Sequence, residues 1–450
     1  MKHVRIGNGC GFWGDNLDAP QRLAEAGRLD YLTLEYLAEL TMSILALIKA
    51  KDANAGFATD FIDVLTRLAP TLKAQPRLKI VTNAGGMNPK ACALAAKQVL
   101  ASAGLAEKKV AVVTGDDLLP RLDALLAGGH ALNHLDNGSP LSSIRDKVVS
   151  ANAYLGAKPI AEALARGADI VITGRVADAS LTVGPAAHEF GWNFDDLNRI
   201  AAATVAGHLI ECGAQATGGL WINADDSTRL ENVGYPIAEM SEDGTFTVSK
   251  PDNTGGVVNI ETVSEQLLYE VADPARYFTP DVTADFTTVK LSQLAPDVVS
   301  VTGGAANGIT DTYKVSVAYR DGFMSAGTLV IAGPNAATKA RRSGAIILEK
   351  LKQAGFTYAE SRVESLGTGE CVPGVVSANF DPPEVVLRVA VRDPRRAAVE
   401  RFTKEFAPLV TSGFPGTTGY TVGRPPVREV FAYWPALIAK SALTDAVEVL

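Results

Sequence analysis

The sequence predicts an α/β fold, with an open, mostly parallel sheet flanked by helices in the N-terminal part and an α+β domain in the C-terminal part. Three observations predict it. Short apolar runs alternate with helix-length segments. The runs end in glycine-rich or acidic turns, as strands do before a helix. Beyond about Trp221 turns multiply and strand-like segments predominate. We therefore expect domains at residues 1–220 and 221–450, with a soft boundary because no linker, repeat or low-complexity tract separates them.

In the N-terminal part each predicted strand is followed by a turn and a helix. The helix after the third strand is the best marked, because Asn88 suits its N-cap, Pro89 its first position and Gly104 the residue past its end. The predicted strands are residues 4–8, 31–36, 78–82, 110–115 and 170–172. We expect Asp116 and Asp117 to open the helix after the fourth strand, where acidic residues favour the helix dipole or could hold a divalent cation.

The C-terminal part reads as strands with two helices on an antiparallel-looking sheet. The predicted helices are residues 336–354 and 394–406. The predicted strands are residues 282–291, 297–302, 312–319, 324–332, 361–365, 384–392 and 428–433.

Composition and charge exclude several classes of protein. The net charge of -8 and the pI near 5.3, with no basic block, argue against nucleic-acid binding. The N-terminal segment has no apolar core of a signal peptide, and no apolar run is long enough to span a membrane, so we expect a cytoplasmic protein with no membrane partner. The four cysteines are widely separated, which disfavours disulfides and structural zinc.

The turn after the strand at residues 170–172 carries the first candidate site residues. Arg175 is suited to bind a carboxylate or phosphate through two parallel hydrogen bonds, and Ser180 could assist it. Asp178 could be a base, a metal ligand or a partner that orients Arg175. The alternative is an ion pair that only holds the turn.

The first two strands end in further candidates. The segment "GNGCGFWGD" contains Asn8 and Cys10, and its glycine spacing does not match a dinucleotide-binding fingerprint. Cys10 is either a reactive thiolate or a small buried apolar residue. Glu35 could be a general base at the end of the second strand, whereas Glu39 fits an exposed helix face equally well.

The third turn, "NAGGMN", could bind an anion. Asn83, Gly85, Gly86 and Asn88 precede a helix whose first N–H groups are free to donate. The alternative is a tight turn whose glycines are required only by backbone conformation.

His208 and Glu211 lie three residues apart near the end of a predicted helix, so they share a face and could transfer protons. His130 and His134 have the spacing of a metal pair only if their segment is helical, and its Asn, Gly and Pro residues argue against that. We predict no metal site, and the sequence indicates no particular cofactor.

Six motifs together resemble the acyclic terpene utilisation AtuA family, which is also known as a domain of unknown function. They are "GNGCGFWGD", "DYLTLEYLAE", "TNAGGMNP", "TGRVADASL", "GHLIECGAQATGG" and "KPDNTGGVVN", and the resemblance extends to about Pro435. It implies a catabolic role beside acyl-CoA carboxylases and hydratases that process branched acids. Some relatives continue into a small ferredoxin-like domain that others keep as a separate chain, so the resemblance also implies a small partner subunit.

Three functions are compatible with these residues. The favoured one is an enzyme, most simply a lyase or hydratase, that acts on a small carboxylate or its CoA thioester. Such chemistry needs a base, a proton donor and groups that stabilise an enolate-like oxygen. The second is a non-catalytic subunit that binds an acyl-CoA or scaffolds a pathway enzyme, and the third is a hydrolase that uses Cys10. An oligomer is expected for a catabolic enzyme of two domains.

Overall fold

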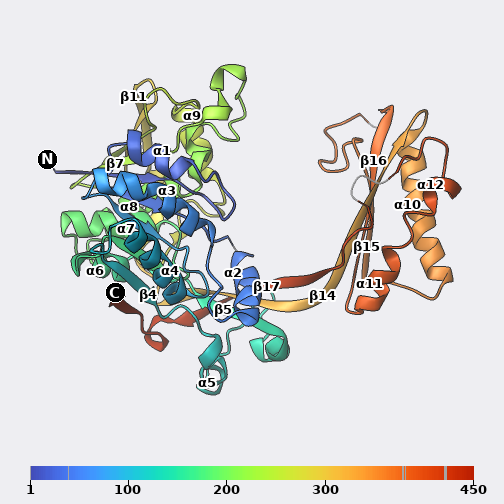
Figure 1. The fold of residues 1–450 in the computed structure, drawn as a ribbon, viewed down its shortest axis with the longest axis horizontal. Coiled ribbons are helices and arrows are strands. Elements are labelled where there is room, and N and C mark those ends of the chain that lie inside the picture. The colour runs from blue at the N-terminus through green and yellow to red at the C-terminus, as the bar shows by residue number, and fades with distance from the viewer. Residues whose placement is uncertain (1, 39, 378–379, 381, 420–422) are drawn as a thin grey trace. The chain divides into compact units, whose positions relative to one another are not determined.

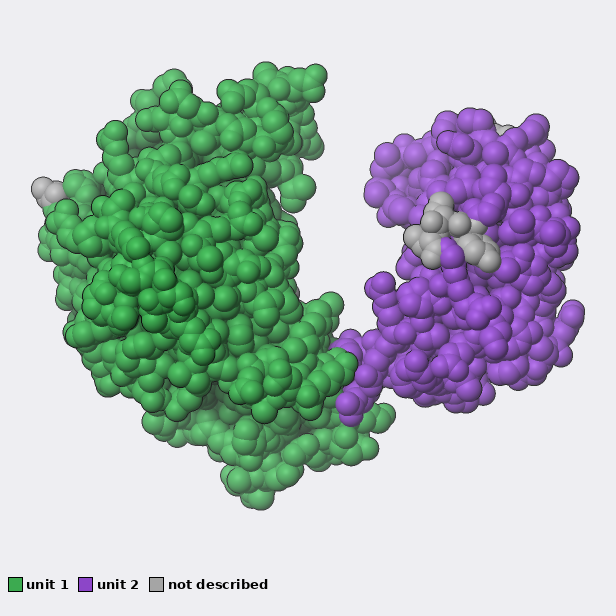
Figure 2. Space-filling model, in the orientation of Figure 1, with its two compact units in different colours: residues 1–318, 433–450 green, residues 319–432 purple. Residues whose placement is uncertain are grey.

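The computed structural model describes residues 2–38, 40–377, 380, 382–419 and 423–450. The chain forms two compact units, one of residues 1–318 with 433–450 and one of residues 319–432 (Figure 2). It enters the second unit through strand β14 (Thr312–Ala332) and returns through β17 (Arg428–Ala439). The expected boundary near residue 220 lies inside the first unit.

The first unit is built on a ten-stranded sheet with a parallel centre, which confirms the predicted α/β class (Figure 1). The parallel strands are, in spatial order, β1 (His3–Asn8), β2 (Tyr31–Leu34), β3 (Lys79–Thr82), β6 (Ile170–Thr173) and β4 (Val110–Thr114). Antiparallel strands extend both edges: β7 (Ile237–Ser241), β8 (Phe246–Ser249), β12 (Val298–Thr302) and β11 (Lys290–Ala295) beyond β1, and β18 (Ala446–Val449) beyond β4.

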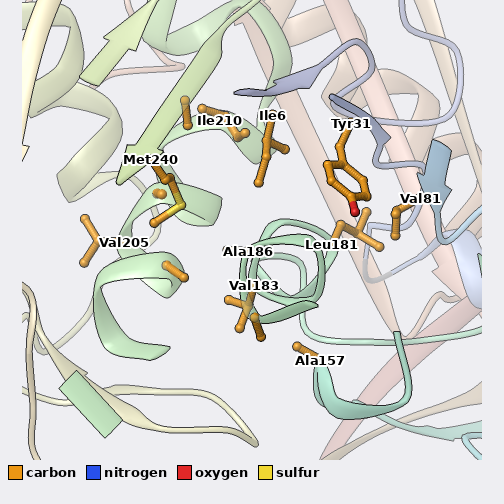
Figure 3. Packing of buried hydrophobic residues seen from close by; sticks show 14 of the residues in the cluster. Ile6, Tyr31, Val81, Ala157, Leu181, Val183, Ala186, Val205, Ile210 and Met240 are labelled. Carbon is orange, nitrogen blue, oxygen red and sulfur yellow. The ribbon is translucent and has the colours of Figure 1, made fainter. Parts of the chain in front are cut away.

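Helices cover both faces of this sheet, which explains why its central strands are continuously apolar. Val81 and Val171 belong to a core with α6 (Lys158–Ala165), α7 (Ser180–Phe190) and α8 (Leu197–Glu211). Figure 3 shows Tyr31 and Val81 beside Leu181 in this core. Ile80 and Ile172 point to the other face, where the core includes α1 (Ala19–Ala26), α3 (Asp60–Ala74) and α4 (Pro89–Ser102).

The remaining elements of the first unit surround this sheet. The remaining helices are α2 (Thr41–Lys51), α5 (Leu122–Ala127) and α9 (Ile260–Leu268), and the strands are β5 (Val148–Ala153), β9 (Tyr277–Phe278), β10 (Thr283–Asp285) and β13 (Ala305–Ala306). Two predictions were wrong in detail. Asp116 and Asp117 do not open a helix, because α5 begins only after a 3₁₀ turn at Leu119–Arg121. The predicted strand at 282–291 is divided between β10 and β11, which belong to different sheets.

The second unit is an antiparallel sheet packed on helices. Its strands follow the order β15 (Glu360–Leu366), β16 (Glu384–Asp393), β14 and β17. Residues from α10 (Ala336–Gln353), α11 (Arg396–Phe402) and α12 (Leu409–Ser412) share its core. The α+β architecture expected for the C-terminal part is therefore present in residues 319–432.

In the part of the chain that the structure describes, we find no helix with the length and apolar character needed to cross a lipid bilayer.

Candidate active site

A cavity of about 520 Å³ opens at the carboxyl ends of the central strands of the first unit. The segments after β1, β2 and β6 contribute to it, as ligand sites in parallel sheets commonly require. The end of α8 and the turn that follows it form another part of its wall. The lining residues are Gly11, Phe12, Asp15, Glu35, Leu37, Ala38, Asp178, Glu211, Cys212, Ala214, Gln215, Gly219, Leu220, Tyr235, Tyr269 and Glu270.

Glu35 is held by donors on one side of its carboxyl group. Its Oε1 accepts from the backbone N–H of Leu37 at 2.8 Å and from the Asn83 side-chain amide. Its Oε2 is buried and makes no hydrogen bond. Burial and the nearby carboxylate of Asp178 raise the pKa of Glu35 well above its ordinary value, although Arg175 and Asn83 act in the opposite direction. Glu35 is thus suited to hold a proton within reach of a ligand.

Arg175 lies behind the cavity wall, and its side chain contacts several protein groups. Its Nη1 donates to Asp178 Oδ1 at 2.6 Å and to the carbonyl oxygen of Leu37 at 3.1 Å, and it lies 3.9 Å from Glu35 Oε1. The guanidinium carbon lies 4.1 Å from the ring centroid of Tyr154. Only 1% of Arg175 is exposed, so in this conformation it orients the carboxylates and does not meet the cavity.

Glu211 repeats the pattern seen at Glu35. His208 Nδ1 lies 3.1 Å from Glu211 Oε1, while Glu211 Oε2 is buried without a partner. Burial raises the pKa of Glu211, against the lowering effect of His208. The His208 ring is 2% exposed and packs 5.2 Å from both Tyr277 and Phe286, which fixes its orientation. His208 therefore supports Glu211 from behind the wall.

Asn8 and Gly11 join the first strand to the end of α8. Asn8 Nδ2 donates to the carbonyl oxygens of Cys10, Ile210 and Glu211 at 3.0, 2.8 and 2.9 Å. These last two carbonyls are among those that a helix end leaves without partners. A Cβ atom on Gly11 would lie 2.7 Å from the carbonyl carbon of Cys212, so a glycine is needed at this approach. Asn8 and Gly11, at and just after the end of β1, therefore hold in place the end of α8 that carries Glu211.

Most of the third turn is occupied by its own structural contacts. The Asn83 side-chain amide donates to Glu35, and Asn83 Oδ1 accepts from the backbone N–H of Tyr36 at 2.8 Å. Asn88 caps α4 and donates to the carbonyl oxygens of Ala53 and Ala55, in the loop between α2 and α3. Gly85 has no room for a Cβ, which would lie 2.5 Å from the Thr173 carbonyl oxygen, and Gly86 has a φ of +47°. These contacts support the tight-turn alternative for Gly85, Gly86 and Asn88.

Cys10 and Ser180 also lie away from the cavity lining among the described residues. The Cys10 thiol is buried and donates to the Phe12 carbonyl oxygen at 3.2 Å, and burial together with Asp15 raises its pKa well above the ordinary value. This does not support a thiolate nucleophile. Ser180 is buried, and its side chain forms a hydrogen bond with the Asp281 carboxyl group.

The structure adds polar lining residues that the sequence did not single out as site candidates. Asp15, Cys212 and Gln215 belong to motifs in which other residues were the candidates, whereas Tyr235 and Glu270 come from the region expected to form another domain. Tyr235 donates its hydroxyl to Asp15 Oδ1 at 2.6 Å. Glu39 lies outside the described residues. Within the described ranges, no group of three or more His, Cys, Asp or Glu residues is arranged to hold a metal ion.

Comparison with known proteins gives one match. A family model described as "Acyclic terpene utilisation family protein AtuA" matches residues 4–449, which is nearly the whole chain. No curated protein and no solved structure matches this chain.

Proposed function

Since the chain belongs to the acyclic terpene utilisation family AtuA, we propose that its cavity catalyses a hydro-lyase reaction on a branched acyl thioester or the corresponding acid. The family is implicated in the utilisation of acyclic terpenes, which is a catabolic process. One observation carries the proposal. Glu35 and Glu211 both line the cavity, and each has one anchored oxygen and one buried oxygen without a partner.

The two carboxyl groups suit complementary roles. Burial and Asp178 raise the pKa of Glu35, so this group supplies the proton that a leaving hydroxyl needs. Glu211 Oε2 takes the proton from the carbon next to the carbonyl group, supported by His208 on its other oxygen. The C–O bond breaks, water leaves and a conjugated double bond forms. Both carboxyl groups then recover their protonation through the open cavity.

Other residues orient these two. Arg175 compensates negative charge between Asp178 and Glu35, and forms its shorter contact with Asp178. The Gln215 amide lines the same cavity and can donate to the carbonyl oxygen of the substrate, where negative charge develops.

Two readouts separate the proposed roles. The full chain is incubated in D₂O with 3-hydroxy-3-methylbutanoyl-CoA, and mass spectrometry follows deuterium at the α-carbon while absorbance follows the conjugated product. Glu211→Gln should lose both reactions by about 10²–10⁴-fold, whereas Glu35→Gln should retain exchange and lose dehydration. Glu107→Gln, an exposed loop residue, is the matched control.

Other outcomes would contradict the proposal. Exchange and dehydration that neither variant alters would exclude these roles. Binding of the thioester, seen as a raised melting temperature, without exchange or dehydration would instead favour a non-catalytic acyl-binding subunit. The small ferredoxin-like partner and the oligomer stay predictions. Adding the partner chain to the assay tests the first, and light scattering tests the second.

A further inference from the structure

The cavity is lined by acidic side chains from several separate segments. They are Asp15 after β1, Glu35 after β2, Asp178 after β6, Glu211 at the end of α8 and Glu270 after α9. Among the described lining residues there is no Lys, Arg or His. Arg175, the cation that contacts Asp178, is buried behind this wall.

A second observation indicates that part of this wall binds a ligand. Glu35 is only 4% exposed, and its Oε2 has no hydrogen-bond partner although the residue lines the cavity. Glu211 Oε2 is in the same state. A buried polar atom without a partner is costly, so these two oxygens are expected to meet ligand groups. A carboxyl group offers a ligand mainly acceptor atoms, with at most one O–H donor when protonated.

We infer that the cavity is a negatively charged compartment that admits an uncharged, hydroxyl-bearing acyl group and excludes a free carboxylate. This inference rests on the proposed function and selects the thioester over the free acid as its substrate. A free carboxylate would lie among like charges with no cation to bind it, whereas a thioester carbonyl is neutral. The phosphates of CoA would stay outside the acidic lining.

Cys212 provides a reporter inside the cavity. It lines the wall beside Glu211 and is partly exposed. Besides burial, the charges of Glu211, Glu270 and Asp178 raise the pKa of its thiol, so this sulfur senses the acidic groups. Cys371, an exposed free thiol in the second unit, is an internal reference in the same molecule.

The test measures the charge preference of the cavity without any substrate. The full chain reacts with methanethiosulfonate reagents that carry a trimethylammonium, a neutral hydroxyl or a sulfonate group, and peptide mass spectrometry gives the rate at each cysteine. The cysteine sulfur forms a disulfide with the reagent and methanesulfinate leaves. The thiolate fraction of Cys212 is common to all three reagents, so it cancels in the ratio of their rates.

At Cys212 we expect the cationic reagent to react at least about tenfold faster than the anionic one, after division by the same ratio at Cys371. Molar salt should reduce this preference, because it screens charges over a few ångström. Glu211→Gln should reduce it by about twofold or more. Glu35→Gln, which replaces a carboxyl group that holds a proton, and the exposed control Glu107→Gln should leave it unchanged. The measurement in molar salt uses the parent protein, so the inference can be tested even where a variant misfolds.

Two results would overturn the inference: a ratio at Cys212 equal to or below that at Cys371, or a ratio insensitive to salt. Neither of them depends on turnover. A cationic preference without exchange or dehydration would leave the charge inference intact and refute the proposed reaction.

Discussion

Arg175 Nη1 lies 2.6 Å from Asp178 Oδ1 within the turn that follows β6, yet their side chains differ in exposure. The Arg175 side chain is 2% exposed and that of Asp178 is 35% exposed. The pair therefore connects the interior of the first unit to the cavity, with the cation inside and the carboxylate at the surface of the wall.

Replacing Arg175 by Lys should destabilise the protein. Lys keeps the charge but loses the planar group that contacts Tyr154, Leu37 and Asp178 together. We expect the free energy of unfolding in urea to fall by on the order of 1–3 kcal/mol. Arg22→Lys is the control, because the Arg22 side chain is 60% exposed. An unchanged stability in Arg175→Lys would contradict the structural role and favour the alternative that Arg175 binds the substrate.

Asn8→Asp should destabilise the join between β1 and α8. The substitution is nearly isosteric, but it replaces an amide that donates to three carbonyl oxygens by a carboxylate oxygen that repels them. We expect a loss on the order of 3 kcal/mol in the same urea measurement. At the exposed Asn137 the side-chain oxygen accepts from Ser139, and Asn137→Asp keeps this acceptor. Equal stability of the two variants would contradict the role assigned to Asn8.

Gly11→Ala should disturb the cavity more than the fold of the second unit. The new Cβ would lie 2.7 Å from the backbone of Cys212, so the segment that carries Glu211 must shift. We expect a destabilisation on the order of 1–3 kcal/mol and faster hydrogen exchange around residue 212. Gly419→Ala, where the Cβ meets no atom within 4 Å, is the matched control. Unchanged exchange around residue 212 would show that this close approach does not position the wall.

Asp116→Asn should flatten the dependence of stability on pH. Burial raises the pKa of Asp116 from 3.8 to about 6, although it accepts hydrogen bonds from the Arg175 backbone and from Asn152. Between pH 4 and 6 the folded state therefore binds more protons than the unfolded chain, so stability falls as pH rises. This group accounts for a loss on the order of 3 kcal/mol that is complete above pH 6.

Urea midpoints from pH 4 to 7 check this sign. The decline between pH 4 and 6 should be smaller in Asp116→Asn than in the parent protein. Asp123→Asn serves as the control, because hydrogen bonding to Arg145 lowers the pKa of that exposed residue. A steeper decline in Asp116→Asn would contradict the raised pKa.

The sequence was sufficient to place the strand ends and their carboxylates. Glu35, Asp178 and Glu211 were each predicted from an apolar run or a helix followed by a polar turn, and all three line one cavity. The exposure of Arg175 could not be predicted, because it depends on Tyr154, which reaches it from a different segment. A strand-end pattern does not reveal what covers the side chain.

The limits of the units and part of the site depend on pairing between distant segments. β7 and β8 look like the start of a new domain in the sequence, but β7 pairs with β1 and extends the same sheet. This pairing brings Tyr235 to the hydroxyl contact with Asp15. Periodicity identifies a strand but not its partner, so the contribution of Tyr235 could not be inferred.

The position of β18 has a consequence for how the protein folds during its synthesis. β18 pairs with β4, and Arg166 donates to the carbonyl oxygen of Val447. A ribosome synthesises β18 only after residues 319–432. The edge of β4 that β18 covers in the folded protein is therefore unpaired while the second unit is synthesised. Exposed strand edges invite pairing with other chains. The large sheet is therefore completed only after the second unit has been synthesised, and the nascent chain passes through a stage at which protection of β4 by a chaperone would favour correct assembly.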